Sequence, residues 1–537
     1  MSTHGISHLA LGTAFSVVSL VACNGVTGLG DLEFNRDATG TGGSTSSAGG
    51  STSSAGGTGG EGGTVNGPDP DLVWGQRFGN EGEDYPTALT YTSTGDLLLG
   101  GSFSGLLDLG GMTAETTGFQ NDAFIARLSP AGAPLYIHSI DDGSLQDCLR
   151  DMDLLPSDRV IALVGSGTSL NSCVAANYPM QPSMAGGYFS YGLTAFKLVT
   201  LDAAGAQTDE KVLCGTCEEG GAEGPMAVAT DLQGNVFVGG SFSGIYLINP
   251  NSGVQSQGGV DAFVMRYNSN GNPAWIRNFG IQDGYSVVTD VVSDGMGGVV
   301  IAGVFEDRFR IDGATHDIPF SQRPIFVARL DDDDGDVLWS HVFERGWGGS
   351  TPHLSAASDG VLMTGDFFGT VDFGGGALQA TGQTPATSDA YLVKFGIDGA
   401  HVWSRRYGDG DDQRLQQGGT SLVVEPSGNL LLGGAFGGTL DLDGASLTAL
   451  GARDAFIARL DPAGAYLTHR HIPSASDTTS QGDILVVPST TGRVAVTGAF
   501  IGAVDYGGEQ PFESESPSSP VNDGFVVVYE EPFREQH

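Results

Sequence analysis

The chain has 537 residues, which is long enough for several domains or for one large repetitive domain. It contains 86 glycines and only 16% charged residues, and no stretch keeps the 3.6-residue periodicity of a helix. This composition indicates many short strands joined by tight turns. The net charge of −40 excludes nucleic acid as a partner, because little basic charge is present to neutralise a phosphate backbone.

Residues 1–22 have the features of an export signal. The apolar run LALGTAFSVVSLVA is too short to span a bilayer comfortably. It leads into LVAC, which ends at Cys23 and resembles a bacterial lipobox, although the first eight residues contain no Lys or Arg. The resemblance implies cleavage before Cys23, lipidation of this cysteine and attachment to the cell envelope. Asn24 favours the outer membrane or cell surface, and an ordinary signal peptide with an incidental cysteine is the alternative.

Residues 23–71 have the composition of a tether. The segment GGSTSSA occurs twice in tandem within a tract of Gly, Ser and Thr. Such a sequence cannot bury enough apolar surface to fold. We therefore expect a disordered linker between the lipidated cysteine and a folded domain over 72–530, with a short tail at 531–537.

Two sequence markers recur along the folded domain at a spacing of 62 to 75 residues. The first is a glycine two residues before an aromatic, at Gly101, Gly240, Gly303, Gly365, Gly434 and Gly498, with Gly165 in a copy that lacks the aromatic. The second is a strand-like heptapeptide, at Asp122–Leu128, Leu193–Val199, Asp261–Tyr267, Pro324–Leu330, Asp389–Phe395, Asp454–Leu460 and Asp523–Tyr529. Two markers in seven copies predict a repeat architecture.

Each copy is predicted to form four short strands. In the first copy these are Thr87–Thr92, Asp96–Phe103, Asp122–Leu128 and Pro134–Ile140. Alternate residues of the third strand, DAFIARL, point to opposite sides, and both sides are largely apolar. This strand is therefore expected between two neighbouring sheets. The Trp that recurs in the fourth strand is expected to pack between repeats.

The two ends of the repeat region complement each other. The last copy stops at its third strand, Gly524–Tyr529, while the segment from Leu72 to Gly79 resembles a fourth strand with no copy before it. Pairing these two segments would remove two open sheet edges. We predict an all-β fold, a seven-bladed β-propeller of four-stranded antiparallel blades that is closed by the N-terminal strand.

The repeats resemble the SBBP-type bacterial β-propeller repeat. The likeness rests on the Gly-x-aromatic marker, the DAFIARL-like strand, a Trp-bearing strand and the motif V-D-F-G-G, matched at Val371–Gly375 and, with Tyr for Phe, at Val504–Gly508. It covers about 72–530, with the second copy departing most. The resemblance implies an exported propeller and carries no catalytic signature.

Four cysteines remain once Cys23 is assigned to lipidation. An even number in an exported protein predicts disulfides, and we prefer Cys148–Cys173 with Cys214–Cys217 among the three connectivities. The CGTC segment also matches a redox motif, and four cysteines match the ligand count of zinc. A redox role is disfavoured, because the segment lacks the βαβ setting that activates such a thiol. A zinc site is disfavoured, because export places the chain in an oxidising compartment.

Acidic residues gather in the loops that enter the copies. In a propeller these loops emerge at one end, around the central channel, and would focus negative potential there. We predict a face for a cation or a basic partner, with ordinary Asp/Gly turn chemistry as the alternative. The candidate residues are Asp84, Asp142, Asp147, Asp283, Asp411, Asp412 and Asp477.

Two other polar segments are predicted to be structural. The acidic run Asp331–Asp334 occupies a slot that other copies fill with hairpin turns, so we expect a turn and not a calcium loop. His469-Arg470-His471 would suit a metal pair, but the segment lies in an outermost strand, where a solvated face is expected.

No nucleophile elbow, P-loop or H-E-x-x-H motif is present. We expect a lipid-anchored envelope protein that acts as a binding or scaffold module for a protein, glycan or cation ligand, and not an enzyme. An extracytoplasmic hydrolase or lyase with a site at the channel mouth is the alternative. No cofactor is expected, with calcium as the alternative, and the membrane is contacted only through the lipid anchor.

Overall fold

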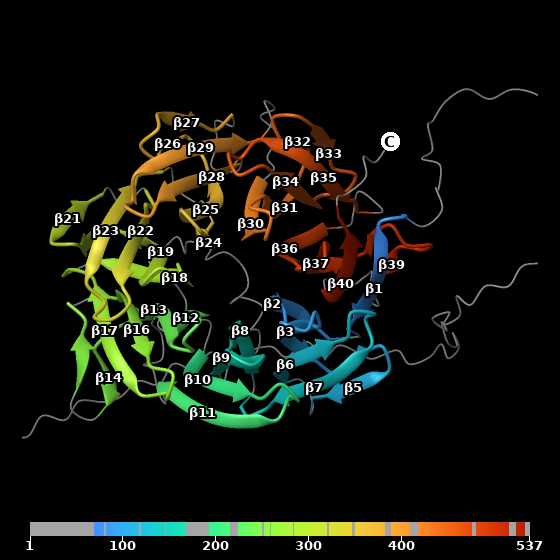
Figure 1. The fold of residues 1–537 in the computed structure, drawn as a ribbon, viewed down its shortest axis with the longest axis horizontal. Coiled ribbons are helices and arrows are strands. Elements are labelled where there is room, and N and C mark those ends of the chain that lie inside the picture. Colours follow the sequence, from blue (N-terminus) through green and yellow to red (C-terminus); the bar gives the residue numbers. More distant parts are fainter. Residues whose placement is uncertain are drawn as a thin grey trace, which may run out of the picture. The chain divides into compact units, whose positions relative to one another are not determined.

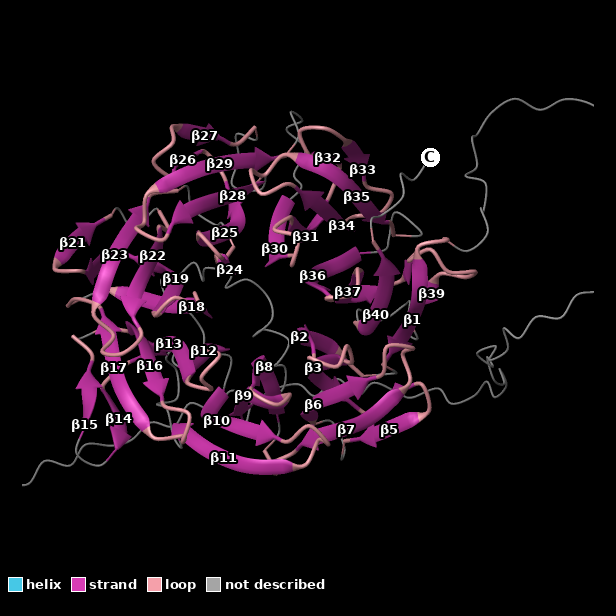
Figure 2. Cartoon of the chain, viewed as in Figure 1, coloured by secondary structure: helices cyan, strands magenta, loops and turns pink. Residues whose placement is uncertain are grey.

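The computed structural model describes residues 69–79, 82–116, 120–144, 146–167, 193–214, 224–249, 252–257, 259–282, 284–318, 322–345, 350–381, 388–408, 417–474, 480–514 and 522–531. The chain divides into Met1–Thr64 and Val65–His537, and every described residue belongs to the second unit. The regular elements of the described residues are all β-strands (Figure 2). These residues include no helix with the length and apolar character needed to cross a membrane.

Most strands pair antiparallel in seven groups of four, which we number in chain order. Group 1 contains β2 (Tyr85–Tyr91), β3 (Leu97–Ser104), β6 (Asn121–Leu128) and β7 (Pro134–Ile140). Group 2 contains β8 (Gln146–Leu155), β9 (Arg159–Gly167), β10 (Leu193–Leu201) and β11 (Gln207–Cys214). Group 3 contains β12 (Gly224–Thr230), β13 (Val236–Phe242), β16 (Asp261–Tyr267) and β17 (Pro273–Phe279). Group 4 contains β18 (Tyr285–Ser293), β19 (Gly298–Glu306), β22 (Ile325–Asp331) and β23 (Val337–Phe343).

The remaining groups follow the same order. Group 5 contains β24 (His353–Ala357), β25 (Gly360–Phe367), β28 (Asp389–Gly396) and β29 (His401–Tyr407). Group 6 contains β30 (Gln417–Val424), β31 (Leu430–Phe436), β34 (Asp454–Leu460) and β35 (Tyr466–Ile472). Group 7 contains β36 (Ser480–Pro488), β37 (Arg493–Ile501), β40 (Asp523–Glu530) and β1 (Leu72–Phe78). A single parallel bridge, Asn121 to Gln146, joins groups 1 and 2 into one eight-stranded sheet.

Group 7 combines strands from the two ends of the repeat region. Strand β1 pairs antiparallel with β40, and Arg77 lies opposite Phe525 in the register. The side chain of Arg77 forms an ion pair of 2.6 Å with Asp523, the first residue of β40. The backbone N–H of Glu530 donates to the carbonyl of Asp71 at the other end of the ladder.

The groups follow one another in chain order around a common centre, with the first strand of each group innermost (Figure 1). The innermost strands contact each other in sequence, β2 with β8, β8 with β12, β12 with β18, β18 with β24, β24 with β30 and β30 with β36. Strand β36 in turn contacts β2. We call each region between consecutive groups a seam and name it by the groups, so that seam 7/1 lies between groups 7 and 1.

The third strand of each repeat is buried on both sides, as its sequence predicts. On β6, Phe124 packs with Val526 and Val528 of group 7, whereas Ile125 packs with Val160 and other residues of group 2. Strand β34, the second DAFIARL copy, lies in the same way between groups 5 and 7. The identical heptapeptides therefore occupy equivalent places, where apolar burial on both faces is the main stabilising term.

The glycine of the Gly-x-aromatic marker is required by close backbone approach. A Cβ at Gly101, Gly240 or Gly303 would overlap the carbonyl oxygen of the neighbouring innermost strand. The long excursion after this marker forms a second, smaller hairpin that the sequence does not predict. These hairpins are β4 (Leu106–Leu109) with β5 (Met112–Glu115), β14 (Ile245–Asn249) with β15 (Ser252–Gln255), β20 (Arg308–Ile311) with β21 (Ala314–Asp317), β26 (Thr370–Asp372) with β27 (Ala377–Gln379), β32 (Thr439–Asp441) with β33 (Ser446–Thr448), and β38 (Ala503–Val504) with β39 (Phe512–Glu513).

An aromatic side chain from one group rests on a turn glycine of the next group in five seams. The pairs are Trp74 with Gly132, Tyr136 with Gly205, Trp275 with Gly335, Trp339 with Gly399 and Trp403 with Gly464. Each of these glycines has a positive φ. The indole N–H of Trp275 also donates to the carbonyl of Asp332, which lies in the turn between β22 and β23. The packing role of the recurring Trp and the turn at Asp331–Asp334 are thus confirmed.

The solvated face predicted for His469-Arg470-His471 is wrong for Arg470. This side chain is only 2% exposed, and its guanidinium carbon lies 3.8 Å from the ring centroid of Tyr529. It also forms an ion pair with Asp69, just before β1. The error arises because β35 is the outermost strand of its own group yet faces group 7.

Candidate functional site

The aspartate that opens the third strand has a structural partner in four groups. Its partner lies on the outermost strand of the same group, across the strand register. The pairs are Asp523 with Arg77 at 2.6 Å, Asp389 with Arg406 at 2.6 Å, Asp454 with His471 at 2.8 Å and Asp261 with Asn278 at 3.0 Å.

In three groups the same carboxylate also accepts backbone N–H groups from the segment that leads into the third strand. Asp389 accepts from Thr381 at 3.0 Å, and Asp261 accepts from Gln257 at 3.1 Å. Asp454 accepts from Leu450 at 2.8 Å. These bonds satisfy the loop backbone and anchor it to the sheet, so the recurring aspartate is mainly structural.

Group 1 departs from this pattern. The outermost strand offers Asp122 only the neutral hydroxyl of Ser139. Oxygen atoms of Asp122, Asp141 and Asp147 lie within 4.8 Å of one another. Asp122 belongs to β6 and Asp147 to β8, which the single parallel bridge brings together, and Asp141 and Asp142 lie in the turn between β7 and β8. We call Asp122, Asp141, Asp142 and Asp147 the acidic cluster.

Burial and mutual repulsion make this cluster retain protons near neutral pH. Burial, together with the charges of Asp141 and Asp147, raises the pKa of Asp122 to about 7. Burial raises the pKa of Asp147 to about 6, although the Ser166 hydroxyl donates to it at 2.6 Å. Burial also acts on Asp142, but the backbone N–H of Ser144 donates to its carboxylate at 3.0 Å and Lys197 lies 3.6 Å away, and the net effect is a lowered pKa.

The cluster has the chemistry of a site for a hard divalent cation. Carboxylate oxygens are the ligands that calcium and magnesium prefer. A bound cation would replace the protons held by Asp122 and Asp147, because it relieves the same repulsion between carboxylates. The three converging carboxylates would supply part of the six to eight oxygens that calcium takes.

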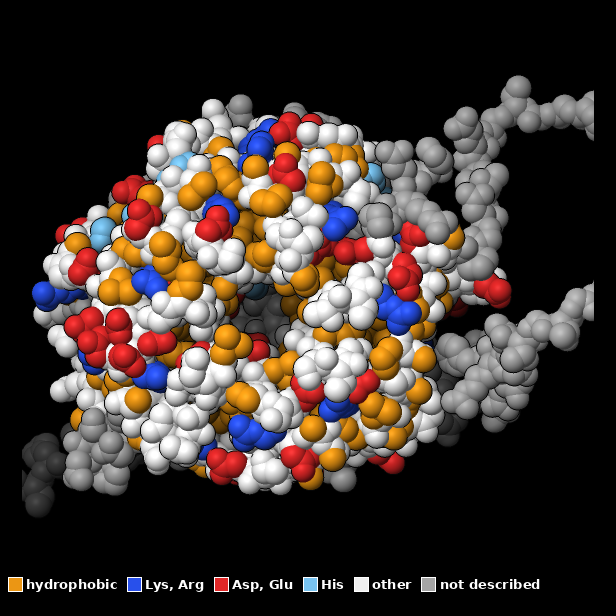
Figure 3. Space-filling model, viewed as in Figure 1, with side chains coloured by type: hydrophobic (Ala, Val, Ile, Leu, Met, Phe, Trp, Pro, Cys, Tyr) orange, Lys and Arg blue, Asp and Glu red, His pale blue; other side chains and the backbone are white. Residues whose placement is uncertain are grey.

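The predicted acidic residues do not all meet at one place. The structure brings Asp142 and Asp147 together, but Asp84 lies in seam 7/1, buried against Gly79 and near Asp523. Asp283, Asp411, Asp412 and Asp477 lie outside the described residues. On the face shown in Figure 3, acidic side chains form several separate patches. Sequence reasoning misses Asp122, because it looks like one more strand residue of the repeat. The signal was Ser139, which stands where four other copies have Arg, His or Asn.

Further buried acids on the innermost strands connect neighbouring groups. Asp151 and Asp153 of β8 accept the backbone N–H groups of Val228 at 2.8 Å and Thr230 at 2.7 Å. Asp290 of β18 accepts that of Leu354 at 2.7 Å. Burial raises the pKa of all three carboxyl groups. They satisfy donors on the open edge of the next innermost strand, which is a structural task.

The predicted disulfides fall largely outside the described part of the chain. Cys148 is buried on β8. Cys214 ends β11, and its side chain is not described. Cys23, Cys173 and Cys217 lie outside the described residues. Lipidation at Cys23 and both pairings therefore stay predictions.

No model of a known protein family matches the chain, and no curated protein matches it. Solved structures with a similar fold include a quinohemoprotein alcohol dehydrogenase from Comamonas testosteroni, at 10% identity over 87% of this chain and 77% of that chain, with a TM-score of 0.39. BamB from Moraxella catarrhalis is 12% identical over 87% of this chain and 99% of that chain, with a TM-score of 0.34. Both are β-propeller-like, as is the all-β arrangement described above, and neither likeness assigns a function to this chain.

Proposed function

We propose that the seven groups are the blades of a closed seven-bladed β-propeller of the SBBP type. Two contacts support closure: the pairing of β1 with β40, and the contact of β36 with β2. Hydrogen exchange would test it. The amides of β1 that donate to β40 should be protected as strongly as those in the outermost strands of other groups, such as β29, and early exchange of β1 alone would show that the ring is open.

We further propose that this propeller is a binding or scaffold module, held at the cell envelope by a lipid on Cys23. The observation that favours binding over catalysis is the use of the buried carboxylates. On the described third and innermost strands the buried carboxylates accept backbone N–H groups or pair with neighbouring side chains. The acidic cluster is the exception to this pattern. A hydrolase or lyase would need an acid and a base that are free to exchange protons with substrate.

The anchor is tested by fractionation of cells that express the full chain. The wild-type protein should enter the detergent phase and carry an acylated N-terminal cysteine by mass spectrometry. Cys23→Ser should remain aqueous and uncleaved before residue 23. A wild-type chain that is processed elsewhere and partitions into water would contradict the anchor.

Within this proposal the acidic cluster is the candidate cation site. Calcium chloride at millimolar concentration should raise the melting temperature and release protons at pH 7, because a ligand that binds only the folded state stabilises it. Asp122→Asn should abolish both effects. Asp108→Asn, exposed on β4 and outside any group of converging carboxylates, is the matched control and should leave them unchanged. An unmoved melting temperature in the wild type would remove cation binding from the proposal.

A further inference from the structure

A cleft of about 350 Å³ opens in seam 7/1. It lies at the end of the third strand opposite to the one where Asp523 pairs with Arg77. Group 7 contributes Val528, Arg493 and Glu530, and group 1 contributes Tyr91 and Gly95. The rest of the lining is Trp74, Thr94, Leu97, Ser129, Pro130, Ser489 and Thr491.

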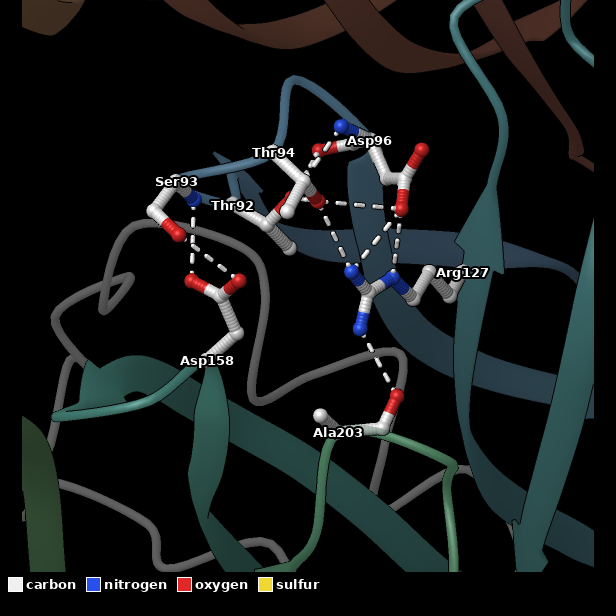
Figure 4. Close-up of polar contacts among 7 residues, drawn as sticks. All are labelled: Thr92, Ser93, Thr94, Asp96, Arg127, Asp158 and Ala203. Atoms are coloured by element: carbon white, nitrogen blue, oxygen red, sulfur yellow. Dashed lines mark hydrogen bonds and ion pairs between the residues drawn. The ribbon is translucent and has the colours of Figure 1, made fainter.

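The equivalent position in seam 1/2 is filled by the protein itself (Figure 4). Arg127 of β6 donates to Asp96 at 2.9 Å and to Thr94 at 3.0 Å, and it reaches the Ala203 carbonyl of group 2 at 2.7 Å. From the other side, Asp158 of group 2 accepts hydrogen bonds from the backbone N–H and the hydroxyl of Ser93, at 2.9 and 2.8 Å.

Both of these side chains are missing from seam 7/1. Val528 follows Asp523 by five residues, as Arg127 follows Asp122, and it replaces a basic residue that groups 1, 3, 4, 5 and 6 all retain. Those five residues are Arg127, Arg266, Arg329, Lys394 and Arg459. Gly95 occupies the turn position of Asp158, and both have a positive φ. The cleft therefore lies where Val528 lacks the basic group of the other copies and where Gly95 lacks the carboxylate that Asp158 supplies in seam 1/2.

Arg493 restores only part of the lost contact. Its guanidinium donates to the Pro130 carbonyl at 3.0 Å, as that of Arg127 donates to Ala203, and it pairs with Glu530 at 3.0 Å. Tyr91 lies beside this ion pair, and its buried hydroxyl has no hydrogen-bond partner among the described residues. A buried hydroxyl without a partner is costly, so a ligand that reaches it gains affinity.

The lining selects the chemistry of the ligand. Arg493 and Glu530 cancel in charge, so the cleft attracts neither a phosphate nor a free cation strongly. Their ion pair offers donors and acceptors together, and Thr94, Ser129, Ser489 and Thr491 add hydroxyl groups. Trp74 and Tyr91 supply aromatic surface, with Leu97 and Val528 as apolar lining. A neutral ligand that is rich in hydroxyl groups matches this combination.

We propose that the cleft of seam 7/1 binds a neutral sugar unit of a glycan. The site is distinct from the acidic cluster and does not depend on cation binding there. Its volume is at the small end for ligand pockets, which suits a single sugar residue with its neighbours in solvent.

The test uses the full chain and ligand-observed NMR with four sugars: glucose, galactose, mannose and N-acetylglucosamine. Inorganic phosphate and free arginine are the charged comparison ligands. At least one sugar should bind in the millimolar range, more tightly than either charged ligand. The proposal is overturned if no sugar binds at about 10 mM, or if phosphate or arginine is preferred.

Two variants place back the side chains that other seams contain. Val528→Arg and Gly95→Asp should each weaken sugar binding at least tenfold, because each adds a side chain inside the cleft, and a cooperative thermal transition should show that each variant is folded. Leu232→Arg adds the same charge at an exposed turn of group 3 and should bind as the wild type does. Undiminished binding by both filling variants would place the sugar elsewhere and contradict the proposal, as would an equal loss in the control.

Discussion

Seams 1/2 and 7/1 join equivalent strands of neighbouring groups, but they differ at both ends of the third strand. In seam 7/1, Arg77 neutralises the opening aspartate, whereas Val528 leaves a cleft at the other end. In seam 1/2, Ser139 leaves the opening aspartate among other carboxylates, whereas Arg127 fills the far end. Each seam thus lacks one basic side chain that the other seam contains. The candidate sites of this molecule are the places where one copy omits a side chain that the other copies use for structure.

The largest loss is expected where the N-terminal strand is fastened, since the comparison depends on β1 belonging to group 7. Asp69→Ala would leave Arg470 buried without its carboxylate partner. Removing one partner of a buried ion pair costs about 3–5 kcal/mol of the free energy of unfolding. Urea denaturation followed by tryptophan fluorescence measures the change. Asp108→Ala, exposed on β4, should cost less than about 0.5 kcal/mol, and equal losses in both variants would contradict a fastening role for Asp69.

Arg77→Ser makes seam 7/1 resemble seam 1/2. Asp523 is 1% exposed and would lose its guanidinium partner, so the free energy of unfolding should fall by about 2–3 kcal/mol at pH 8. The pKa of Asp523 should rise in the folded protein, so protonation at pH 5 should recover part of the loss. Denaturation at the two pH values tests this, and a loss that does not change with pH would show that Arg77 acts through packing alone.

An effect of similar size is expected from the aromatic contact that both seams share. Gly132→Ala in seam 7/1 and Gly205→Ala in seam 1/2 would each push a Cβ into an aromatic ring, at 2.8 and 2.6 Å. We expect a loss of about 2–3 kcal/mol for each, from backbone strain and overlap together. Gly271→Ala has the same positive φ but open space around it, so it should cost only about 1 kcal/mol. Equal melting temperatures for the three variants would mean that the aromatic contact contributes nothing.

Much of the fold follows from periodicity alone. The strands predicted at Asp122–Leu128 and Pro134–Ile140 match β6 and β7 to within a residue, because burial on both faces and flanking turns leave little freedom. The small hairpins such as β26–β27 escape prediction, because three-residue strands carry almost no pattern. The candidate sites escape for another reason. A motif search finds residues that are present, whereas Ser139 and Val528 matter because a basic side chain is missing at these positions.

Burial across seams also limits what one sequence reveals. Arg470 has the pattern of a solvent-facing residue within its own strand, and only the approach of group 7 and Asp69 buries it. In the same way Asp122 and Asp147 are 25 positions apart in the chain, and only the Asn121–Gln146 bridge places their carboxylates together. Contacts of this kind depend on register between neighbouring sheets, which local sequence pattern does not encode.

A pH-dependent effect is expected from converting seam 1/2 to the arrangement of seam 7/1. Asp122 and Asp147 have pKa values of about 7 and about 6 in the folded chain, against about 3.9 when unfolded. The folded state therefore binds protons more tightly, so the stability from these protons is fully present below pH 4 and is lost as pH rises through 6 to 7. Between pH 5 and pH 8 the ionisation of these two carboxyl groups should lower the free energy of unfolding by up to about 4 kcal/mol.

Ser139→Arg places a guanidinium beside Asp122, as Arg77 lies beside Asp523. It should lower the pKa of Asp122, flatten the pH dependence and make the chain more stable than the wild type at pH 8. Ser139→Gln, which adds length without charge, should keep the wild-type slope. Denaturation curves from pH 5 to pH 8 distinguish these outcomes. If the arginine and glutamine variants share one slope, the missing charge at position 139 is not what sets the acidic cluster apart from the other copies.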